Sequence, residues 1–213
     1  MTLPAQLWLT HTTLTGPQSE HLRYTASALH KKLMRMFPDG LGPQPRRQAG
    51  ALYRVEPDDC ALQLLVQSQI APDLSAFPSA RSRSLLPLFE HLTEGTPVYY
   101  RIAANPTKAV RDPENPKKRG TRKALYGDQA NDWWRRKAHD AGLAPVTLDS
   151  SRYAFGSDVR RHGDNDRLLN HGIQFDGVAE VTDQQRLTSA IVEGIGRGRA
   201  YGLGLLSVVP ARR

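Results

Sequence analysis

The chain has 213 residues, enough for one large domain or two small ones, and its 29 Lys and Arg against 21 Asp and Glu give a formal net charge of +8. This excess favours a polyanionic partner, while Cys60, the only cysteine, excludes a disulfide framework and a cluster of thiolate metal ligands. No apolar run approaches the ~18 residues of a membrane span and no secretory signal is visible, so we expect a cytoplasmic protein that contacts no membrane.

The N-terminal half predicts a strand, a helix and a hairpin. In order, the predicted elements are a strand at residues 5–14, a helix from Ser19 to about Phe37, strands at 52–55 and 61–70, and a helical or irregular segment at 85–94. Apolar side chains recur at intervals of three and four from Leu22 to Phe37, which is the spacing of an amphipathic helix. Pro38 ends that helix, and Pro87 interrupts the last segment.

The C-terminal half repeats this order and extends it. It predicts strands at 98–104, 144–155, 173–181 and 205–209, helices at 128–141 and from Asp183 onward, and polar or basic loops at 107–123 and around 160–167. Each half therefore approximates the β-α-β-β-α-β order of a ferredoxin-like domain. We predict an α+β fold of two tandem ferredoxin-like (RRM-like) domains, residues 1–95 and 96–213.

A glycine loop lies near the C-terminus, with Gly194, Gly196, Gly198, Gly202 and Gly204 inside eleven positions. Such a run fits neither a helix nor an ordinary strand, and it predicts positive φ angles or a close approach to an anionic ligand. Because Arg197 and Arg199 lie inside the loop, we predict that it binds a phosphate chain. The glycine spacing and the helix before the loop exclude a dinucleotide-binding turn, and no P-loop motif occurs. An extended helix C-cap, which needs one glycine, is the alternative.

The positive charge is concentrated in residues 101–137, which contain eleven Lys and Arg against four Asp and Glu. We predict that this segment binds RNA phosphates, and a solvated surface run is the alternative. The basic residues proposed for this contact are Arg101, Lys108, Lys117, Lys118, Arg119, Arg122 and Lys123.

The residue patterns of several hydrolase classes are missing. No two histidines are four residues apart and no H-E-x-x-H occurs, so neither a metal site nor a cofactor is predicted. No G-x-S-x-G nucleophile elbow and no carboxylate cluster for a two-metal nuclease is visible. What remains is a metal-free cleavage of RNA, in which the 2′-hydroxyl attacks its own phosphodiester while a base and an acid transfer protons.

His30 is the best-placed side chain for this proton transfer. Its imidazole titrates near neutral pH, and it flanks the apolar stripe of the first helix, one position past Leu29. Arg23 lies seven residues earlier on the same face, and Ser27 lies one turn away. Judged from these residues alone, an ordinary surface or packing histidine is the more common outcome.

Four segments, in the same order, resemble the CasE (Cse3) family, the CRISPR-associated endoribonucleases of type I-E Cascade systems. They are Leu29–Pro38 (L-H-x-x-L-x-x-x-F-P), Tyr100–Lys108, Trp134–Lys137, and the glycine loop with the strand that follows it to Pro210. The resemblance implies tandem ferredoxin-like domains and metal-independent cleavage of precursor CRISPR RNA at the base of the repeat stem-loop, leaving a 2′,3′-cyclic phosphate. It also implies that the enzyme stays on its product and has the repeat RNA and other Cascade subunits as partners.

The family's catalytic histidine falls on His30, and Lys31 or Arg23 is expected to stabilise charge on the scissile phosphate. The resemblance further assigns RNA contacts to Arg160, Arg161 and Arg167, where the family inserts a basic hairpin, and to the signature glycines Gly194, Gly196, Gly202 and Gly204. Family members often carry Tyr three residues before the histidine, whereas this chain has Ser27. A structural RNA-binding subunit that does not cleave is therefore the alternative, and a DNA-binding protein is a weaker third.

Overall fold

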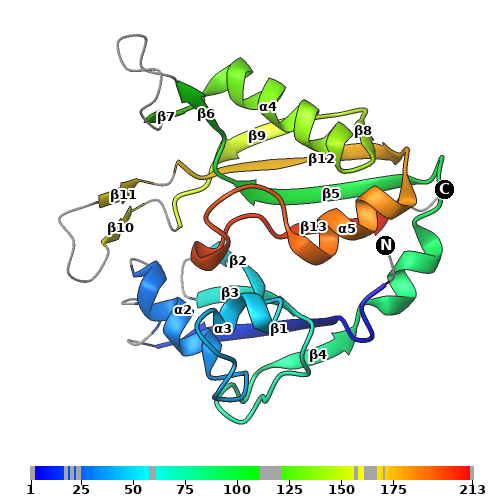
Figure 1. The fold of residues 1–213 in the computed structure, drawn as a ribbon. Coiled ribbons are helices and arrows are strands. Elements are labelled where there is room, and N and C mark those ends of the chain that lie inside the picture. Colours follow the sequence, from blue (N-terminus) through cyan, green and yellow to red (C-terminus); the bar gives the residue numbers. More distant parts are fainter. Residues whose placement is uncertain are drawn as a thin grey trace.

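The computed structural model describes residues 3–16, 19, 22, 25–57, 61–110, 121–155, 158–160, 167–169 and 171–211. Figure 1 shows two β-sheets, the N-terminal one below and the C-terminal one above, each with helices packed on it. The predicted α+β fold with two ferredoxin-like units is confirmed, while the boundary at residue 95 stays a prediction. Within the described ranges, no helix has the length and apolar character needed to cross a bilayer.

The N-terminal sheet has the strand order β4-β1-β3-β2, and all neighbouring strands are antiparallel. Its strands are β1 (Trp8–Thr15), β2 (Leu52–Pro57), β3 (Ala61–Ser68) and β4 (Arg81–Ser84). The first and third strands are central, as a ferredoxin-like unit requires. The predicted first strand and the predicted hairpin are therefore confirmed.

The first helix is interrupted near its start. Its described part, α2 (Ala26–Met34), follows Thr25, whose φ of −129° and ψ of 79° lie outside the helical region. The single helix predicted from Ser19 is therefore wrong at Thr25, a β-branched residue that favours helices weakly. The carbonyl of Thr25 accepts the N–H of Leu29 at 3.0 Å, so that α2 begins directly after it. The side chains predicted to face the core from α2 are indeed buried: Ala26, Leu29 and Leu33.

No helix lies between β3 and β4, although a complete ferredoxin-like unit carries one there and residues 69–80 are all described. The segment turns instead, with Asp73 Oδ1 accepting the Ser75 N–H at 2.8 Å. Phe77, which is 1% exposed, fills the core where a helix would pack. The segment predicted at 85–94 contains a 3₁₀ helix, η1 (Leu86–His91), which leads from the first sheet to the second.

The C-terminal sheet repeats the strand order as β13-β5-β12-β8, with β9 also paired to β12. Its elements are β5 (Pro97–Ala104), α4 (Gly127–Asp140), β8 (Leu143–Pro145), β9 (Asp149–Arg152), β12 (Ile173–Val181), α5 (Gln184–Glu193) and β13 (Leu206–Pro210). The strand predicted at 144–155 is split, because the N–H groups of Val146 and Thr147 both donate to the Val178 carbonyl, at 2.8 and 3.0 Å. The predicted start of α5 is confirmed, since Asp183 Oδ1 accepts the Arg186 N–H at 2.9 Å.

Two antiparallel hairpins extend from one end of this sheet, at the left of Figure 1. They are β6 (Thr107–Val110) with β7 (Thr121–Ala124), and β10 (Asp158–Arg160) with β11 (Arg167–Leu169). The prediction that residues 107–123 form a loop throughout is therefore wrong for residues 107–110 and 121–123, which lie in strands. Proline and charge dominate the segment's composition, but the β-branched residues at its ends pair across the hairpin.

The two units are joined through a shared core. The Tyr153 hydroxyl donates to the Val55 carbonyl and accepts the Val55 N–H, both at 2.9 Å. Buried Arg54 pairs with Glu56 at 2.9 Å and donates to Ser207 Oγ at 2.9 Å. Residues of the C-terminal half that pack in the N-terminal core are Ala103, Tyr153, Phe155 and Leu203. Side chains on the two halves can therefore be held in fixed positions relative to one another.

Candidate nucleic-acid interface

His30 is half-buried on α2, beside the fully buried Leu29. α2 contacts both the turn η2 (Arg199–Tyr201) of the glycine loop and the hairpin strand β10. Burial lowers the pKa of His30 below its ordinary value, and the positive charge of Arg46 lowers that pKa further. The neutral imidazole, the form that accepts a proton, therefore persists to lower pH than in an exposed histidine.

The glycine loop, residues 194–204, closes on its own ends. Its five glycines all have positive φ, from +74° at Gly194 to +88° at Gly204, which confirms the predicted backbone. The Ile195 N–H donates to the Gly204 carbonyl at 2.9 Å, and the Gly204 N–H donates to the Ala103 carbonyl at 2.6 Å. A Cβ on Gly204 would lie 2.7 Å from Ile195 O. Only Gly194 caps α5, so the C-cap alternative accounts for one glycine of the five.

Tyr53 connects the glycine loop to the helix that carries His30. Its hydroxyl donates to the Ala200 carbonyl at 3.0 Å and lies 3.5 Å from the Ala26 carbonyl. Burial raises the pKa of Tyr53 well above its ordinary value, so the hydroxyl stays protonated and able to donate. The helix that carries His30 and the glycine loop, at opposite ends of the sequence, are thereby brought together.

Three arginines gather beside this junction. Arg46 and Arg47 on the short helix α3 (Pro45–Gln48) and Arg199 on η2 line one cavity of about 310 Å³, to which Glu193 also contributes. Arg46 is held in place, because its Nη1 donates to the Ala51 carbonyl at 2.8 Å. Burial lowers the pKa of Arg46, and the charges of Arg199 and then Arg47 lower it further. Guanidinium groups this close favour an anion between them.

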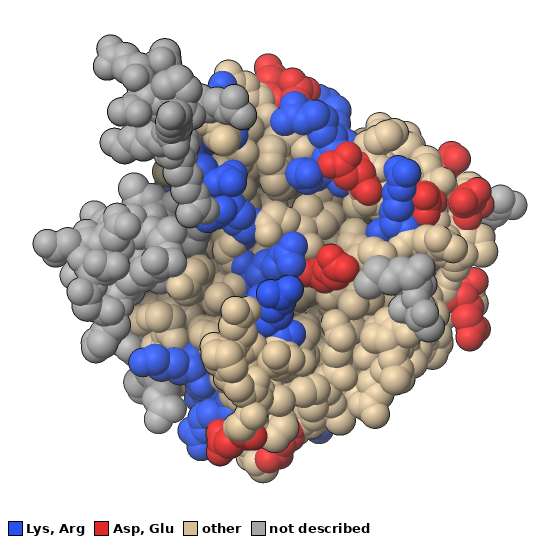
Figure 2. Space-filling model, in the orientation of Figure 1, with Lys and Arg blue, Asp and Glu red and all other residues tan. Residues whose placement is uncertain are grey.

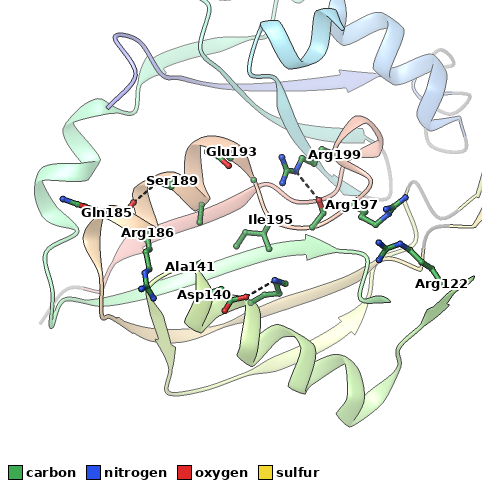
Figure 3. Close-up of a pocket in the computed structure, with 14 residues that line it drawn as sticks. Arg122, Asp140, Ala141, Gln185, Arg186, Ser189, Glu193, Ile195, Arg197 and Arg199 are labelled. Carbon is green, nitrogen blue, oxygen red and sulfur yellow. Dashed lines mark hydrogen bonds and ion pairs between the residues drawn. The ribbon is translucent and has the colours of Figure 1, made fainter. Parts of the chain in front are cut away.

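A larger cleft of about 620 Å³ lies between α4, α5 and the glycine loop (Figure 3). The charged residues that line it are Arg122, Lys137, Arg186, Arg197 and Arg199, with Asp140 and Glu193. Lys137 Nζ lies 2.9 Å from Asp140 Oδ2, whereas Arg197 and Arg199 extend from the loop. Since Arg199 lines both cavities, they adjoin. Figure 2 shows Lys and Arg as a band that crosses the middle of this face.

The β6–β7 hairpin adds cations at the edge of this cleft. Lys108 lies opposite Lys123 and Ala109 opposite Arg122, and these three basic side chains are exposed. Because Arg122 also lines the large cleft, the hairpin and the glycine loop form one basic surface. Of the predicted RNA contacts, the structure brings Arg122, Arg197 and Arg199 together in this cleft, whereas Lys108 and Lys123 are exposed on the hairpin and do not line it.

On α2, the other predicted catalytic residues occupy different environments. Lys31 is exposed and follows His30 directly, while Ser27 is half-buried one turn before it. Residues of the predicted site that lie outside the described residues are Arg23, Lys117, Lys118, Arg119 and Arg161. Arg160 and Arg167 lie opposite each other in the β10–β11 pair, and the structure describes only their backbone.

Arg101 is engaged by carboxylates. Its Nη1 lies 2.7 Å from Glu56 Oε2, and its Nε donates to Asp176. The hydrogen bond from Arg101 to Asp176 and the charge of Glu56 raise the pKa of Arg101. These ion pairs link β5 to β2 and β12 and favour a structural role, so the predicted RNA contact of Arg101 stays a prediction.

Three further basic residues line these cavities although no sequence pattern predicts them there: Arg46, Lys137 and Arg186. The Arg46–Arg47 doublet was a visible signal, but no local pattern places α3 against the glycine loop. Lys137 belonged to the charge-rich segment, and Arg186 is isolated in the sequence. In the part of the chain that is described, no three His, Cys, Asp or Glu residues gather in a way that could hold a metal ion.

Comparisons with known proteins match the chain across both sheets. A family model described as "CRISPR associated protein" matches residues 7–210. The chain is 28% identical to the CRISPR-associated endoribonuclease Cse3 of Thermus thermophilus, over 96% of this chain and 100% of that protein. It is 27% identical to the CRISPR system Cascade subunit CasE of Escherichia coli, over 85% of this chain and 90% of that protein. The solved structure of T. thermophilus Cse3 bound to an RNA representing a pre-cleavage complex matches with a TM-score of 0.74 and 25% identity, over 96% and 100% of the two chains.

Proposed function

The chain belongs to the CRISPR-associated protein family, and we propose that it is an endoribonuclease that cleaves precursor CRISPR RNA at the base of the repeat stem-loop. We further propose that it remains on its product as a subunit of a Cascade complex, as the name of its E. coli relative, Cascade subunit CasE, suggests. The observation that carries the proposal is the position of His30 beside the glycine loop and Arg46. The His30 imidazole, which can accept a proton, thus lies near the arginine-lined cavity, which suits a phosphate.

In the proposed reaction, His30 removes the proton of the 2′-hydroxyl, because its lowered pKa keeps the imidazole neutral. The 2′-oxygen then forms a bond to phosphorus while the bond from phosphorus to the 5′-oxygen breaks. The leaving oxygen takes up a proton from solvent or from Lys31, which is exposed next to His30. The products are a 2′,3′-cyclic phosphate and a 5′-hydroxyl, and no metal ion takes part.

The arginine cluster offers a substitute for the tyrosine that family members often carry at the position of Ser27. Negative charge develops on the phosphate oxygens as the 2′-oxygen attacks, and fixed guanidinium groups stabilise it. Arg46 is preorganised by its hydrogen bond to Ala51, and Arg199 by a bond from its Nε to the Gly196 carbonyl at 3.2 Å. We propose that these two arginines supply the stabilisation that a tyrosine at position 27 would otherwise provide.

The basic surface is proposed to hold the RNA stem by its phosphates. It runs from the β6–β7 hairpin through Arg122 to Arg197 and Arg199, next to the proposed reaction site. Proteins read an A-form stem mainly through its shape and backbone, which suits a surface rich in cations. Binding should therefore weaken steeply as salt is added.

Incubating the wild-type protein in EDTA with the repeat stem-loop of its own CRISPR array tests the proposal. We expect one cut at the base of the stem, a 2′,3′-cyclic phosphate on the 5′ fragment, and no cut in a matched RNA with a 2′-deoxynucleotide at the scissile position. Tight binding of both RNAs without a cut would leave only the structural RNA-binding subunit. A requirement for added Mg²⁺, or a cut in the deoxy RNA, would contradict the proposed chemistry.

A further inference from the structure

A separate cavity of about 530 Å³ lies where the two hairpins leave the C-terminal sheet. It is lined by Tyr126 and Gly127 at the start of α4, by Ser150, Ser151, Arg152 and Tyr153 of β9 and the residue after it, and by His171, Gly172 and Ile173 at the start of β12. None of these residues lines the cavities around the glycine loop. The reaction proposed above leaves this cavity without a role.

Tyr126 and His171 form an aromatic pair on the wall of this cavity. The Tyr126 hydroxyl lies 2.8 Å from His171 Nδ1, and the ring centroids are 5.3 Å apart at an interplanar angle of 73°. Tyr126 is nevertheless 59% exposed. Unlike a singly exposed aromatic residue, Tyr126 has its hydroxyl paired and lines a cavity, and tyrosine in such a setting is enriched at interfaces.

The pair also connects the two hairpins. Tyr126 follows the end of β7 by two residues, and His171 follows the end of β11 by two residues. Both hairpins carry opposed basic residues, Lys108 opposite Lys123 in one and Arg160 opposite Arg167 in the other. An RNA backbone that contacted both hairpins would pass close to this cavity, where the exposed Arg152 supplies a cation.

The floor of the cavity is rigid. Tyr153 is fixed by its two hydrogen bonds to Val55, and Gly172 packs so closely that a Cβ there would clash with the Tyr153 carbonyl oxygen. Ser150 and Ser151 of β9 also line the cavity. The cavity thus combines an aromatic ring, a guanidinium and serine side chains that can form hydrogen bonds.

We propose that this cavity binds one unpaired nucleotide adjoining the RNA stem, with its base stacked on Tyr126 and its phosphate near Arg152. This inference rests on the proposed function. A base within the A-form stem is already paired and stacked, so only an unpaired base can turn out of the RNA and lie on an aromatic ring. Stacking of this kind changes affinity by roughly five- to a hundredfold per base, and the cavity volume is ample for a nucleotide.

The test compares two RNAs on protein that cannot cut them. In a His30→Ala background, the repeat stem-loop is used either with its unpaired flanks or trimmed to the last base pair, and 2-aminopurine replaces each flanking nucleotide in turn. We expect quenched fluorescence at one flanking position with intact Tyr126 and with Tyr126→Phe, and loss of the quenching with Tyr126→Ala. Tyr126→Ala should also weaken binding of the flanked RNA about tenfold and leave the trimmed RNA within about twofold.

Tyr99→Ala is the matched control, because Tyr99 on β5 is 57% exposed and does not line the cavity; it should retain both the quenching and the affinity. Quenching that persists in Tyr126→Ala, or an equal loss of affinity for both RNAs, would overturn the inference while the proposed function stands. If the trimmed stem-loop fails to bind even when Tyr126 is intact, the proposed function itself is contradicted.

Discussion

The two sheets share one strand order, yet the two units contribute different groups to the interface. The N-terminal unit supplies a half-buried histidine on α2 and two arginines on α3. The C-terminal unit supplies an extended basic surface, made of a hairpin, the α4–α5 cleft and the glycine loop. In the proposed reaction the N-terminal unit supplies the base and the C-terminal unit most of the RNA-binding surface, with Arg199 serving both, and the two units meet where Tyr53 connects α2 with the glycine loop.

The largest predicted effect follows from disrupting that meeting point. Gly204→Ala forces a side chain onto a φ of +88° and places a Cβ 2.7 Å from Ile195 O. We expect it to lower the free energy of unfolding by about 2–4 kcal/mol, visible in thermal melting as a drop of roughly 5–15 °C. RNA binding and cleavage should fall together, because the loop serves both units.

Gly40→Ala is the matched control for this experiment. Gly40 has a similar φ of +86°, but a Cβ there would meet nothing within 4 Å. It should cost only about 1–2 kcal/mol of backbone strain and leave binding unchanged. Equal melting temperatures for the two variants would contradict the close packing described for the loop.

An intermediate effect is expected from neutralising the C-terminal surface alone. The double variant Arg122→Ala/Arg197→Ala removes two cations from the large cleft. Because each phosphate contact releases counterions, RNA affinity should fall and the slope of log K against log[salt] should become shallower by about two. The single-turnover cleavage rate at saturating protein should stay within about twofold of wild type, since neither Arg122 nor Arg197 is assigned to the chemistry.

Arg135→Ala provides the comparison for that measurement. Arg135 is also on α4 but is exposed, pairs with Asp132 at 2.9 Å and does not line the large cleft. Its salt slope should match that of wild type. A double variant with an unchanged slope, or one whose cleavage rate falls as much as its affinity, would contradict the separation of the two roles.

The smallest predicted effect concerns the pH dependence of cleavage. A base must be neutral, and the pKa of His30 is lowered, so the acidic limb of the rate profile should lie below the ordinary histidine value. Arg46→Gln removes the second cause of that lowering and should move the limb toward higher pH, while the effect of burial remains. Single-turnover rates between roughly pH 5 and 8 measure the shift, and Arg83→Gln on β4 should leave the limb where it is. A limb that moves toward lower pH in Arg46→Gln contradicts the assignment.

Much of the fold could be predicted because its signals are local. The apolar spacing of α2, the capping of α5 by Asp183 and the five positive φ angles of the glycine loop each follow from a few neighbouring residues. The break at Thr25 and the strand β4 at Arg81–Ser84, where no strand was predicted, could not be predicted in this way. β4 forms because its residues pair with β1, a contact between distant parts of the chain that no local sequence pattern carries.

The site residues likewise fall into those with a local sequence signal and those without one. His30 was proposed from its helical position and from a family resemblance, and the arginines of the glycine loop from their context. Tyr53 and Arg46 were not proposed, because the partner of each lies far away in the sequence. The Tyr53 hydroxyl donates to the Ala200 carbonyl, and Arg46 lies close enough to Arg199 for the charge of Arg199 to lower its pKa. Contacts between the two units are tertiary, and a single sequence carries no local signal for them.

The central claim is that His30 carries the chemistry while other groups hold the RNA. The most direct test is the single-turnover cleavage rate of His30→Ala at saturating protein in EDTA, measured together with its Kd for the repeat stem-loop. His11→Ala, which changes an exposed histidine on β1, serves as the control. The account predicts a rate at least about a hundredfold below wild type for His30→Ala, with Kd within about twofold, and wild-type values for His11→Ala. Cleavage by His30→Ala at the wild-type rate, or a loss of binding that accounts for the whole loss of cleavage, would contradict it.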